Sequence, residues 1–280
     1  MTNLSPYIES ADFKVLSNFE KNNNMNESMN MLNEKGYCVI DLDIVDLIDK
    51  ANQDVAIKVE EKSFKTNSAA YHYNESPRIV EGWKFSDSIK KIATSERLVN
   101  FLRDAYKSEP IPFSTINFLK GTEQPLHSDE FHFGSIPHRY LSGCWIALED
   151  IDPDSGPLSI AEKSHKLPIF SFEMLNIDTP KSEKDFKIAY TMYESWVKEQ
   201  IKKNNFKIST PVLKKGQCLI WLSNLLHGSY EIKNRLLTRK SLVVHYHYEA
   251  CQKIFYPSYS NLEKKRYIPR SLKNLDIRKN

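Results

Sequence analysis

The stretch Gln124-Pro125-Leu126-His127-Ser128-Asp129 is matched further along the chain by Leu225-Leu226-His227-Gly228-Ser229. Both lie beside short runs rich in aromatic and β-branched residues, which predicts that they join strands of a β core. Side chains two apart on a strand leave on the same side, so we expect His127 and Asp129 to share a face. Two histidines and one carboxylate hold ferrous iron on one face and leave the other face open. His127, Asp129 and His227 are therefore the predicted metal ligands.

Each of these residues also has a structural interpretation when it is taken singly. His127 can be a turn histidine with its hydrogen bonds satisfied, and Asp129 can cap the turn that follows it. A second motif strengthens the metal interpretation. Arg239 follows His227 by twelve residues, in Thr238-Arg239-Lys240-Ser241. A guanidinium at this place can clamp a carboxylate through two hydrogen bonds, which indicates an iron enzyme with a dicarboxylate cosubstrate.

The distribution of apolar residues predicts a β core with helices around it. Residues 1–111 read as a mainly helical flank, with one strand at Gly36–Ile40 and helices over Ile44–Ser63, capped by Asp43, and from Ser86 or Ser88 to Tyr106. Residues 112–250 read as a jelly-roll core, interrupted at about 170–206 by an inserted helix that can cover a site. Residues 251–280 read as a basic C-terminal tail, and its most basic part, from Lys264 to Lys279, is expected to be solvated and partly frayed. The expected core strands are Ser114–Leu119, Ser142–Leu148, Leu158–Ala161, Gln217–Trp221 and Ser241–Tyr248.

Composition narrows the class of protein. The 280 residues favour a single domain over two small ones, and 39 basic against 36 acidic residues give a net charge of +3, which predicts no nucleic-acid partner. The four cysteines form no C-x-x-C pair, as expected of free thiols in a reducing compartment. We find no signal peptide and no apolar run long enough to cross a bilayer, so we expect a cytoplasmic protein without a membrane partner. The sequence does not indicate an oligomeric state.

Four blocks of sequence, in order and spacing, resemble the phytanoyl-CoA dioxygenase family of Fe(II)/2-oxoglutarate oxygenases, from about Gly36 to about Tyr248. The resemblance implies a double-stranded β-helix (a jelly roll, cupin-like) with flanking helices. It also implies that His127, Asp129 and His227 bind iron and that Arg239 anchors the distal carboxylate of 2-oxoglutarate. The blocks are Gly36–Ile40; Pro125–Asp129; Cys144–Ile151 with Ser155–Leu158 and Ser164–Lys166; and His227–Ser229 with Arg239–Ser241.

The resemblance extends to two further residues and has one gap. Ser229 is expected to hydrogen-bond the cosubstrate carboxylate. Trp145 matches a tryptophan near the cosubstrate pocket, although an inward tryptophan of the barrel core explains it equally well. Members of the family usually carry Pro-Gly before the Ser/Thr-His-Lys block, where this chain has Glu162-Lys163. We expect that block, with His165, to be structural.

Other histidines and aromatic residues are alternatives to the predicted site. His132 and His138 are expected to shape its mouth, and His245 to lie inside, because it shares strand parity with Arg239. The group Tyr71-His72-Tyr73, with Trp83, can contact substrate from a loop, although packing is the default.

The resulting prediction is an oxygenase that uses Fe(II), 2-oxoglutarate and O2 to hydroxylate a small-molecule metabolite, with release of succinate and CO2. Related halogenases replace the carboxylate ligand with a small residue, so Asp129 favours hydroxylation. The alternatives are desaturation, epimerisation or cyclisation at the same iron site, or a non-catalytic cupin-like protein that binds a metal or ligand. Arg239, at the cosubstrate position, argues against the non-catalytic alternative.

Overall fold

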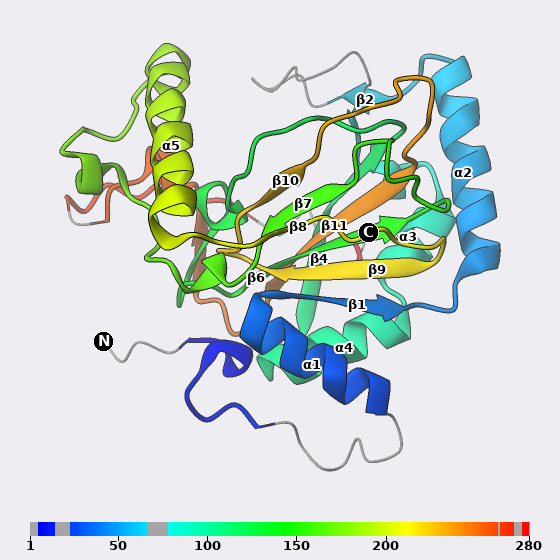
Figure 1. Ribbon diagram of the computed structural model, residues 1–280, viewed down its shortest axis with the longest axis horizontal. Coiled ribbons are helices and arrows are strands. Elements are labelled where there is room, and N and C mark those ends of the chain that lie inside the picture. Colours follow the sequence, from blue (N-terminus) through cyan, green and yellow to red (C-terminus); the bar gives the residue numbers. More distant parts are fainter. Residues whose placement is uncertain (1–4, 15–22, 67–77, 263, 272–275, 280) are drawn as a thin grey trace.

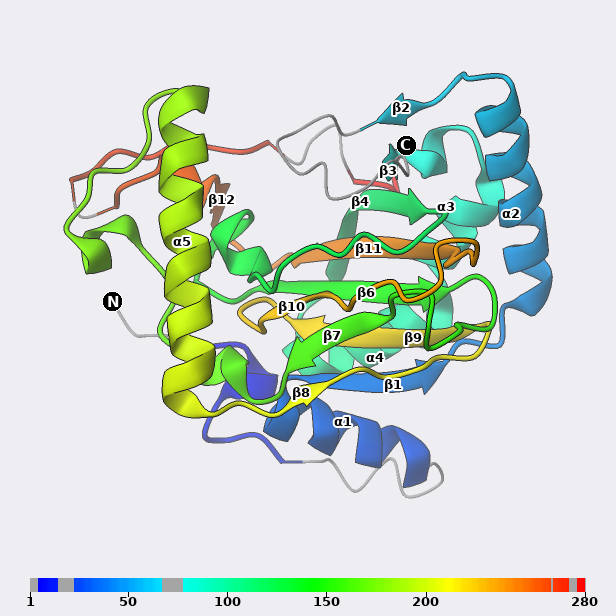
Figure 2. The ribbon, with the colours of Figure 1, turned by 45° about the horizontal axis from the view of Figure 1, so that its top comes forward.

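The computed structural model describes residues 5–14, 23–66, 78–262, 264–271 and 276–279. The Tyr71-His72-Tyr73 group therefore lies outside the described residues. A seven-stranded antiparallel sheet, in the order β1-β9-β6-β11-β4-β3-β2, faces a three-stranded sheet, β10-β7-β8 (Figures 1 and 2). The two sheets form the predicted double-stranded β-helix.

The long sheet is built from both ends of the chain. Its strands are β1 (Tyr37–Asp41), β2 (Lys65–Thr66), β3 (Arg78–Val80), β4 (Pro110–Phe118), β6 (Leu141–Ala147), β9 (Gln217–Leu222) and β11 (Ser241–Tyr248). The short sheet comprises β7 (Leu158–Ala161), β8 (Ile208–Ser209) and β10 (His227–Ser229). The N-terminal flank, which we expected to hold one strand, thus supplies β1, β2 and β3.

Helices cover the outer face of the long sheet. They are α1 (Asn23–Lys35), α2 (Val45–Glu60), α3 (Asp87–Ala93) and α4 (Glu96–Tyr106), with the short η1 (Tyr7–Glu9) and η3 (Gly82–Lys84) beside them. Along β11 the side chains alternate. Leu242, Val244 and Tyr246 face the helices, whereas Val243 lies in the cluster between the two sheets. This period of two places His245 on the inner side.

Two predicted helix starts need correction. Asp43 does not cap α2, because it has a positive φ of 55° and forms an ion pair with Arg97; Ile44 occupies the cap position. The helix predicted from Ser86 to Tyr106 is divided in two. Ser86 caps α3 by accepting a hydrogen bond from the Ile89 amide, and Ser95 begins α4. Thr94 is the C-cap that ends α3, and its Oγ1 donates to the Lys90 carbonyl at 2.9 Å.

The inserted segment and the C-terminal segment pack at one end of the barrel. The insertion forms η6 (Phe172–Leu175) and α5 (Glu183–Asn204), and α5 buries Phe186, Tyr190 and Tyr193. The C-terminal segment forms β12 (Lys253–Phe255), paired with β5 (Gly134–Ile136), and then η7 (Pro257–Tyr259). Ile277 is fully buried. The expectation of a solvated tail is thus wrong for Ile277.

The Ser-His-Lys block forms η5 (Ser164–Lys166), ahead of which Lys163 has a left-handed φ of 68°. That conformation suits glycine, which explains why the family prefers Pro-Gly here. The His165 ring is buried against α1 and contacts the Asn33 carbonyl at 3.2 Å. These contacts are those of a packing residue.

Candidate metal centre and cosubstrate cavity

His127 and His227 are neighbours through an isolated antiparallel bridge. The backbone N–H of each donates to the carbonyl of the other, at 2.9 Å in both directions. Gly228 makes this approach possible, because a Cβ there would lie 2.5 Å from the Gln124 carbonyl oxygen. The expected strand through Asp129 is not present, since Asp129 begins η4 (Asp129–Phe131), capped by the Ser128 hydroxyl. A bridge followed by a tight turn brings the three side chains together.

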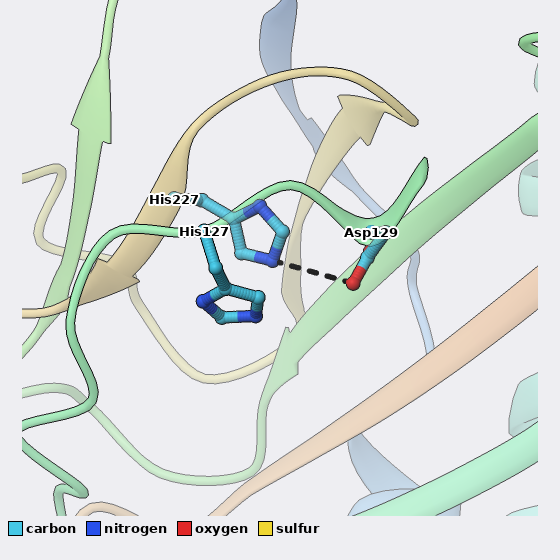
Figure 3. Close-up of side chains that lie close together, drawn as sticks. All are labelled: His127, Asp129 and His227. Carbon is cyan, nitrogen blue, oxygen red and sulfur yellow. Dashed lines mark ion pairs between the residues drawn. The ribbon is translucent and has the colours of Figure 1, made fainter. Parts of the chain in front are cut away.

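The three predicted ligands form one cluster (Figure 3). One ligand atom from each of His127, Asp129 and His227 lies within 4.8 Å of the others, and His227 Nε2 is 3.8 Å from Asp129 Oδ1. Ligand atoms that share one ion at about 2.0–2.2 Å lie closer together than this, so small movements suffice to bind a metal. All three residues are buried. Two imidazoles and a carboxylate with open space beside them match the donor set of non-haem Fe(II) sites.

Backbone carbonyls orient both imidazoles. His127 Nδ1 lies 3.0 Å from the Pro125 carbonyl oxygen, and His227 Nδ1 lies 2.9 Å from that of Leu225. Each carbonyl accepts a hydrogen bond, which assigns the proton to Nδ1 and leaves the Nε2 lone pair for a metal. Burial lowers the pKa of both imidazoles and thus favours the neutral form that binds a metal.

Two side chains from the long sheet hold the second oxygen of the carboxylate. Trp221 Nε1 donates to Asp129 Oδ2 at 2.8 Å, and His245 Nε2 lies 3.4 Å from the same oxygen. Gly143, opposite Trp221 in the sheet, lets the indole lie flat, because a Cβ there would meet the ring at 2.1 Å. Asp129 therefore presents Oδ1 to the ligand cluster. Burial alone would raise the pKa of Asp129, but its interactions with His227 and His245, including the His245 hydrogen bond, outweigh burial and lower that pKa.

Arg239 lies in the same cavity and is 1% exposed. Its Nη1 donates to the Gly156 carbonyl at 2.8 Å and to the Ser229 hydroxyl at 3.1 Å, and its guanidinium lies 5.7 Å from the Trp145 ring centre. Among the described residues its Nε has no hydrogen-bond partner. Burial, and then the nearby charge of Arg78, lowers the pKa of Arg239 to about 9. Arg239, Ser229 and Trp145 thus lie together, and the buried Arg239 guanidinium is a cation suited to an anionic ligand.

The cavity that joins these groups has a volume of about 540 Å³, within the range of small-molecule sites. The cluster of potential metal ligands and Arg239 both line it. Further parts of its wall come from the residues after η4, the first turn of α5 and the C-terminal segment, through His132, Phe133, Glu183, Phe186, Tyr256, Ser258 and Tyr259.

Sequence reasoning missed three residues of this site. Gln124 Nε2 lies 3.3 Å from His127 Nε2, and Gln124 Oε1 accepts a hydrogen bond from Arg78 Nη2 at 2.9 Å. Trp221 was identified only as part of a strand. Trp221 lies two residues after Leu219 on the same strand, so the two side chains share a face, and this spacing could have indicated that Trp221 points inward. The sequence around Arg78 offered no comparable indication.

The histidines that were alternatives to the predicted site take different positions relative to the cavity. His132 lines the cavity, with burial lowering its pKa to about 4, and His138 lies 3.4 Å from Glu130 outside that cavity. His245 lies inside, as strand parity predicts. Trp83 is buried in the core that α2, α3 and the sheet share. No helix in the described part of the chain is long and apolar enough to cross a membrane.

The phytanoyl-CoA dioxygenase (PhyH) family matches residues 32–240, most of the chain, and the chain belongs to this family. It is 24% identical over 203 residues to the peroxisomal phytanoyl-CoA dioxygenase of Bos taurus, which covers 72% of this chain. The chain spans about half of that relative, 52% of its length.

Solved structures share the fold. The non-heme α-ketoglutarate-dependent epimerase SnoN has a TM-score of 0.61 at 15% identity, covering 84% of this chain and 86% of its own. EctD from S. alaskensis, with 2-oxoglutarate and 5-hydroxyectoine, has a TM-score of 0.60 at 18% identity, covering 96% and 92%. SnoN has also been solved with Fe3+ and α-ketoglutarate. The fold class is therefore confirmed.

Proposed function

We propose that this protein is an Fe(II)/2-oxoglutarate-dependent oxygenase that hydroxylates a small-molecule metabolite and releases succinate and CO2. The observation that carries the proposal is the shared cavity. A cluster of two histidines and one aspartate opens into the same space as Arg239, a buried cation for which the described residues offer no carboxylate. A dianionic cosubstrate that binds a metal at one end and a guanidinium at the other suits this arrangement.

The residues of the cavity would form two groups, one that holds the iron and one that receives the cosubstrate. His127, Asp129 and His227 would hold the iron, and Arg239, Ser229 and Trp145 would receive the distal carboxylate of 2-oxoglutarate. Bound iron and 2-oxoglutarate supply the activation of O2 that the protein's own side chains cannot perform. Trp221 and His245 restrain Asp129 Oδ2, so that one carboxylate oxygen is offered and positions remain for cosubstrate and oxygen. The buried walls exclude water.

Other outcomes of the same chemistry are distinguished by the product. SnoN is described as an epimerase and SnoK as a carbocyclase, but their identities of 15% and 13% support a common fold alone. A desaturase is a further alternative. The carboxylate of Asp129 favours hydroxylation over halogenation, since chloride would need its coordination position.

We further propose that residues 1–280 act as one oxygenase domain and that the start of the insertion helps to choose the substrate. Phe186, from the first turn of α5, stacks on Tyr259 with ring centres 5.2 Å apart, and both line the cavity. The middle of α5 is anchored, because Tyr193 stacks on Phe131 at 4.0 Å and its hydroxyl accepts from the Ser128 amide. A mobile cover would therefore involve the Phe186 end of the helix and not the whole 170–206 segment.

The test is a screen of candidate metabolites with Fe(II), 2-oxoglutarate and O2, measured as substrate-stimulated succinate formation. We expect at least one metabolite to raise succinate formation and to gain one oxygen atom. Asp129→Ala should abolish both signals. A product that has lost two hydrogens would indicate desaturation in place of hydroxylation. A product with an unchanged formula would indicate epimerisation. No succinate from iron-loaded protein with any metabolite would favour the binding-protein alternative.

A further inference from the structure

A second cavity, with a volume of about 270 Å³, lies next to the cavity lined by Arg239 and the potential iron ligands, which we call the iron cavity. The second cavity is independent of the proposed function. The two cavities are lined by neighbouring residues of the same segments. Tyr256, Ser258 and Tyr259 line the iron cavity, whereas Phe255 and Pro257 line the second cavity. In η4 the same division separates Asp129 from Glu130 and Phe131. The second cavity therefore has walls and chemistry of its own.

Aromatic rings form much of its wall. Phe131, Phe170 and Phe172 lie at mutual centroid distances of 5.2 to 5.8 Å, and Phe255 lines the cavity with His138, whose ring centre is 6.1 Å away. The faces of aromatic rings carry partial negative charge and attract organic cations. Such a wall suits an ammonium group that carries methyl or methylene groups.

The charged residues of the wall have one sign. Glu130 and Glu173 line the cavity, and no lysine or arginine within the described ranges does so. Glu173 accepts a hydrogen bond from Asn261. The carboxylates and aromatic rings together favour a positively charged ligand over a neutral or anionic one.

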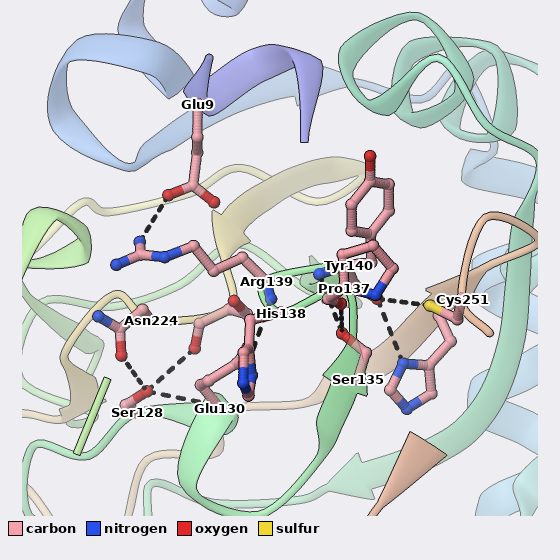
Figure 4. Close-up of polar contacts among 12 residues, drawn as sticks. Glu9, Ser128, Glu130, Ser135, Pro137, His138, Arg139, Tyr140, Asn224 and Cys251 are labelled. Atoms are coloured by element: carbon pink, nitrogen blue, oxygen red, sulfur yellow. Dashed lines mark hydrogen bonds and ion pairs between the residues drawn. The ribbon is translucent and has the colours of Figure 1, made fainter. Parts of the chain in front are cut away.

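Glu130 is the more informative of the two carboxylates, because it is 1% exposed and incompletely paired (Figure 4). Its Oε1 accepts from the Arg139 amide at 3.2 Å and lies 3.4 Å from His138 Nδ1. Its Oε2 has no hydrogen-bond partner among the described residues. A buried carboxylate oxygen without a partner is costly, and a cation beside it relieves that cost.

The guanidinium of Arg139, whose backbone amide bonds Glu130, is engaged elsewhere. Arg139 Nη1 pairs with Glu9 Oε2 at 2.7 Å and donates to the His165 carbonyl at 2.6 Å, while Nη2 donates to the Leu167 carbonyl at 3.0 Å (Figure 4). These contacts direct the guanidinium toward Glu9 and away from Glu130. Arg139 is therefore not the partner of Glu130 Oε2, and His138, which lies beside Oε1, leaves Oε2 without a hydrogen bond among the described residues.

We propose that the second cavity is a binding site for a small organic cation, a protonated amine or quaternary ammonium compound. Its ammonium group lies against the rings of Phe131 and Phe255 and is neutralised by Glu130. This ligand is distinct from 2-oxoglutarate, which is an anion and binds in the neighbouring cavity.

The test is calorimetric titration of the protein, loaded with Zn(II) and 2-oxoglutarate, with tetramethylammonium, choline and benzylammonium. We expect at least one cation to bind with a stoichiometry of one. For choline, the neutral carbon isostere 3,3-dimethylbutan-1-ol should bind at least tenfold more weakly. Glu130→Gln should weaken the best cation at least tenfold and leave the affinity for 2-oxoglutarate unchanged. Glu183→Gln is the matched control, since it removes a carboxylate from the iron cavity instead.

Three results would overturn the proposal: no saturable binding of any of the three cations, equal binding of choline and its isostere, or a loss caused by Glu183→Gln and not by Glu130→Gln. If Glu130→Gln fails to fold, Ser171→Trp takes its place. Ser171 is a partly exposed residue of the same wall, and the indole would fill the cavity. Cation binding that survives this filling would also refute the site.

Discussion

Replacing Arg239 with methionine should remove most of the affinity for 2-oxoglutarate while leaving the metal bound. The guanidinium is 1% exposed, and burial together with Arg78 lowers its pKa from 12.5 to about 9. An arginine keeps its proton in a protein, so this shift expresses the cost of an unneutralised buried charge, about 5 kcal/mol at about 1.4 kcal/mol per pKa unit. A bound carboxylate recovers part of that cost.

The expected loss for Arg239→Met is therefore on the order of 2–5 kcal/mol, roughly thirtyfold to several thousandfold in dissociation constant. The assay is titration of 2-oxoglutarate into Mn(II)-loaded protein, followed by heat or by the rise in melting temperature that ligand binding produces. Arg235→Met is the matched control. Arg235 lies four residues earlier, is largely exposed and pairs with Glu123, so its loss should leave the affinity unchanged.

Arg239→Lys separates charge from geometry. Lysine keeps the positive charge but loses the planar fork, so an intermediate affinity is expected. An unchanged affinity in Arg239→Met, with Mn(II) still bound, would show that another cation, with Arg78 the first candidate, anchors the cosubstrate. That result would refute the assignment of Arg239 even if the protein proved to be an oxygenase.

Three further predictions concern Trp221 and Phe186, which line the cavity, and Glu9, which pairs with Arg139. Trp221→Phe keeps the ring and removes the donor to Asp129 Oδ2, so metal affinity should fall about 10- to 100-fold; metal titration measures it, with Trp196→Phe in α5 as the control, and equal affinities would remove Trp221 from the site. Phe186→Ala should lower substrate-stimulated succinate formation more than uncoupled succinate formation, and amide exchange at the start of α5 should slow when substrate binds; equal losses in both rates would assign Phe186 to the fold. Burial raises the pKa of Glu9 to about 7, so the folded protein holds this proton more tightly than the unfolded chain, and stability should fall as pH rises from about 5 to about 7. Glu9→Gln lacks this loss, and its melting temperature relative to the wild type should therefore rise between pH 5 and pH 8; a difference that is constant with pH would contradict the burial argument.

The three clustered residues and their order along the chain could be predicted from the sequence, because they lie in motifs that carry their own chemistry. His127 and Asp129 are close in sequence, and His227 follows a recognisable strand. Their local geometry could not be read, because the bridge between His127 and His227 depends on Gly228 admitting the Gln124 backbone. The period of two along β11 correctly placed His245 inside, whereas its contact with Asp129 required the three-dimensional structure.

The errors in the fold concern features that local sequence patterns do not carry. The chain leaves the helix at Thr94 and starts α4 after Ser95, a break that helical period alone does not reveal. The C-terminal segment has the composition of a solvated tail, yet Ile277 is buried among the core residues between the long sheet and its helices. Arg78 lies far from the motifs in sequence and reaches the cavity only because β3 pairs with β4.

The most direct test of the account is an anaerobic crystal structure of the protein with Fe(II) and 2-oxoglutarate. The account predicts one iron at about 2.0–2.2 Å from His127 Nε2, His227 Nε2 and Asp129 Oδ1, by analogy with other first-row ions on nitrogen and oxygen ligands. It also predicts that the distal carboxylate of 2-oxoglutarate lies on Arg239. Iron bound at other residues, or 2-oxoglutarate outside the cavity of Arg239, would contradict it.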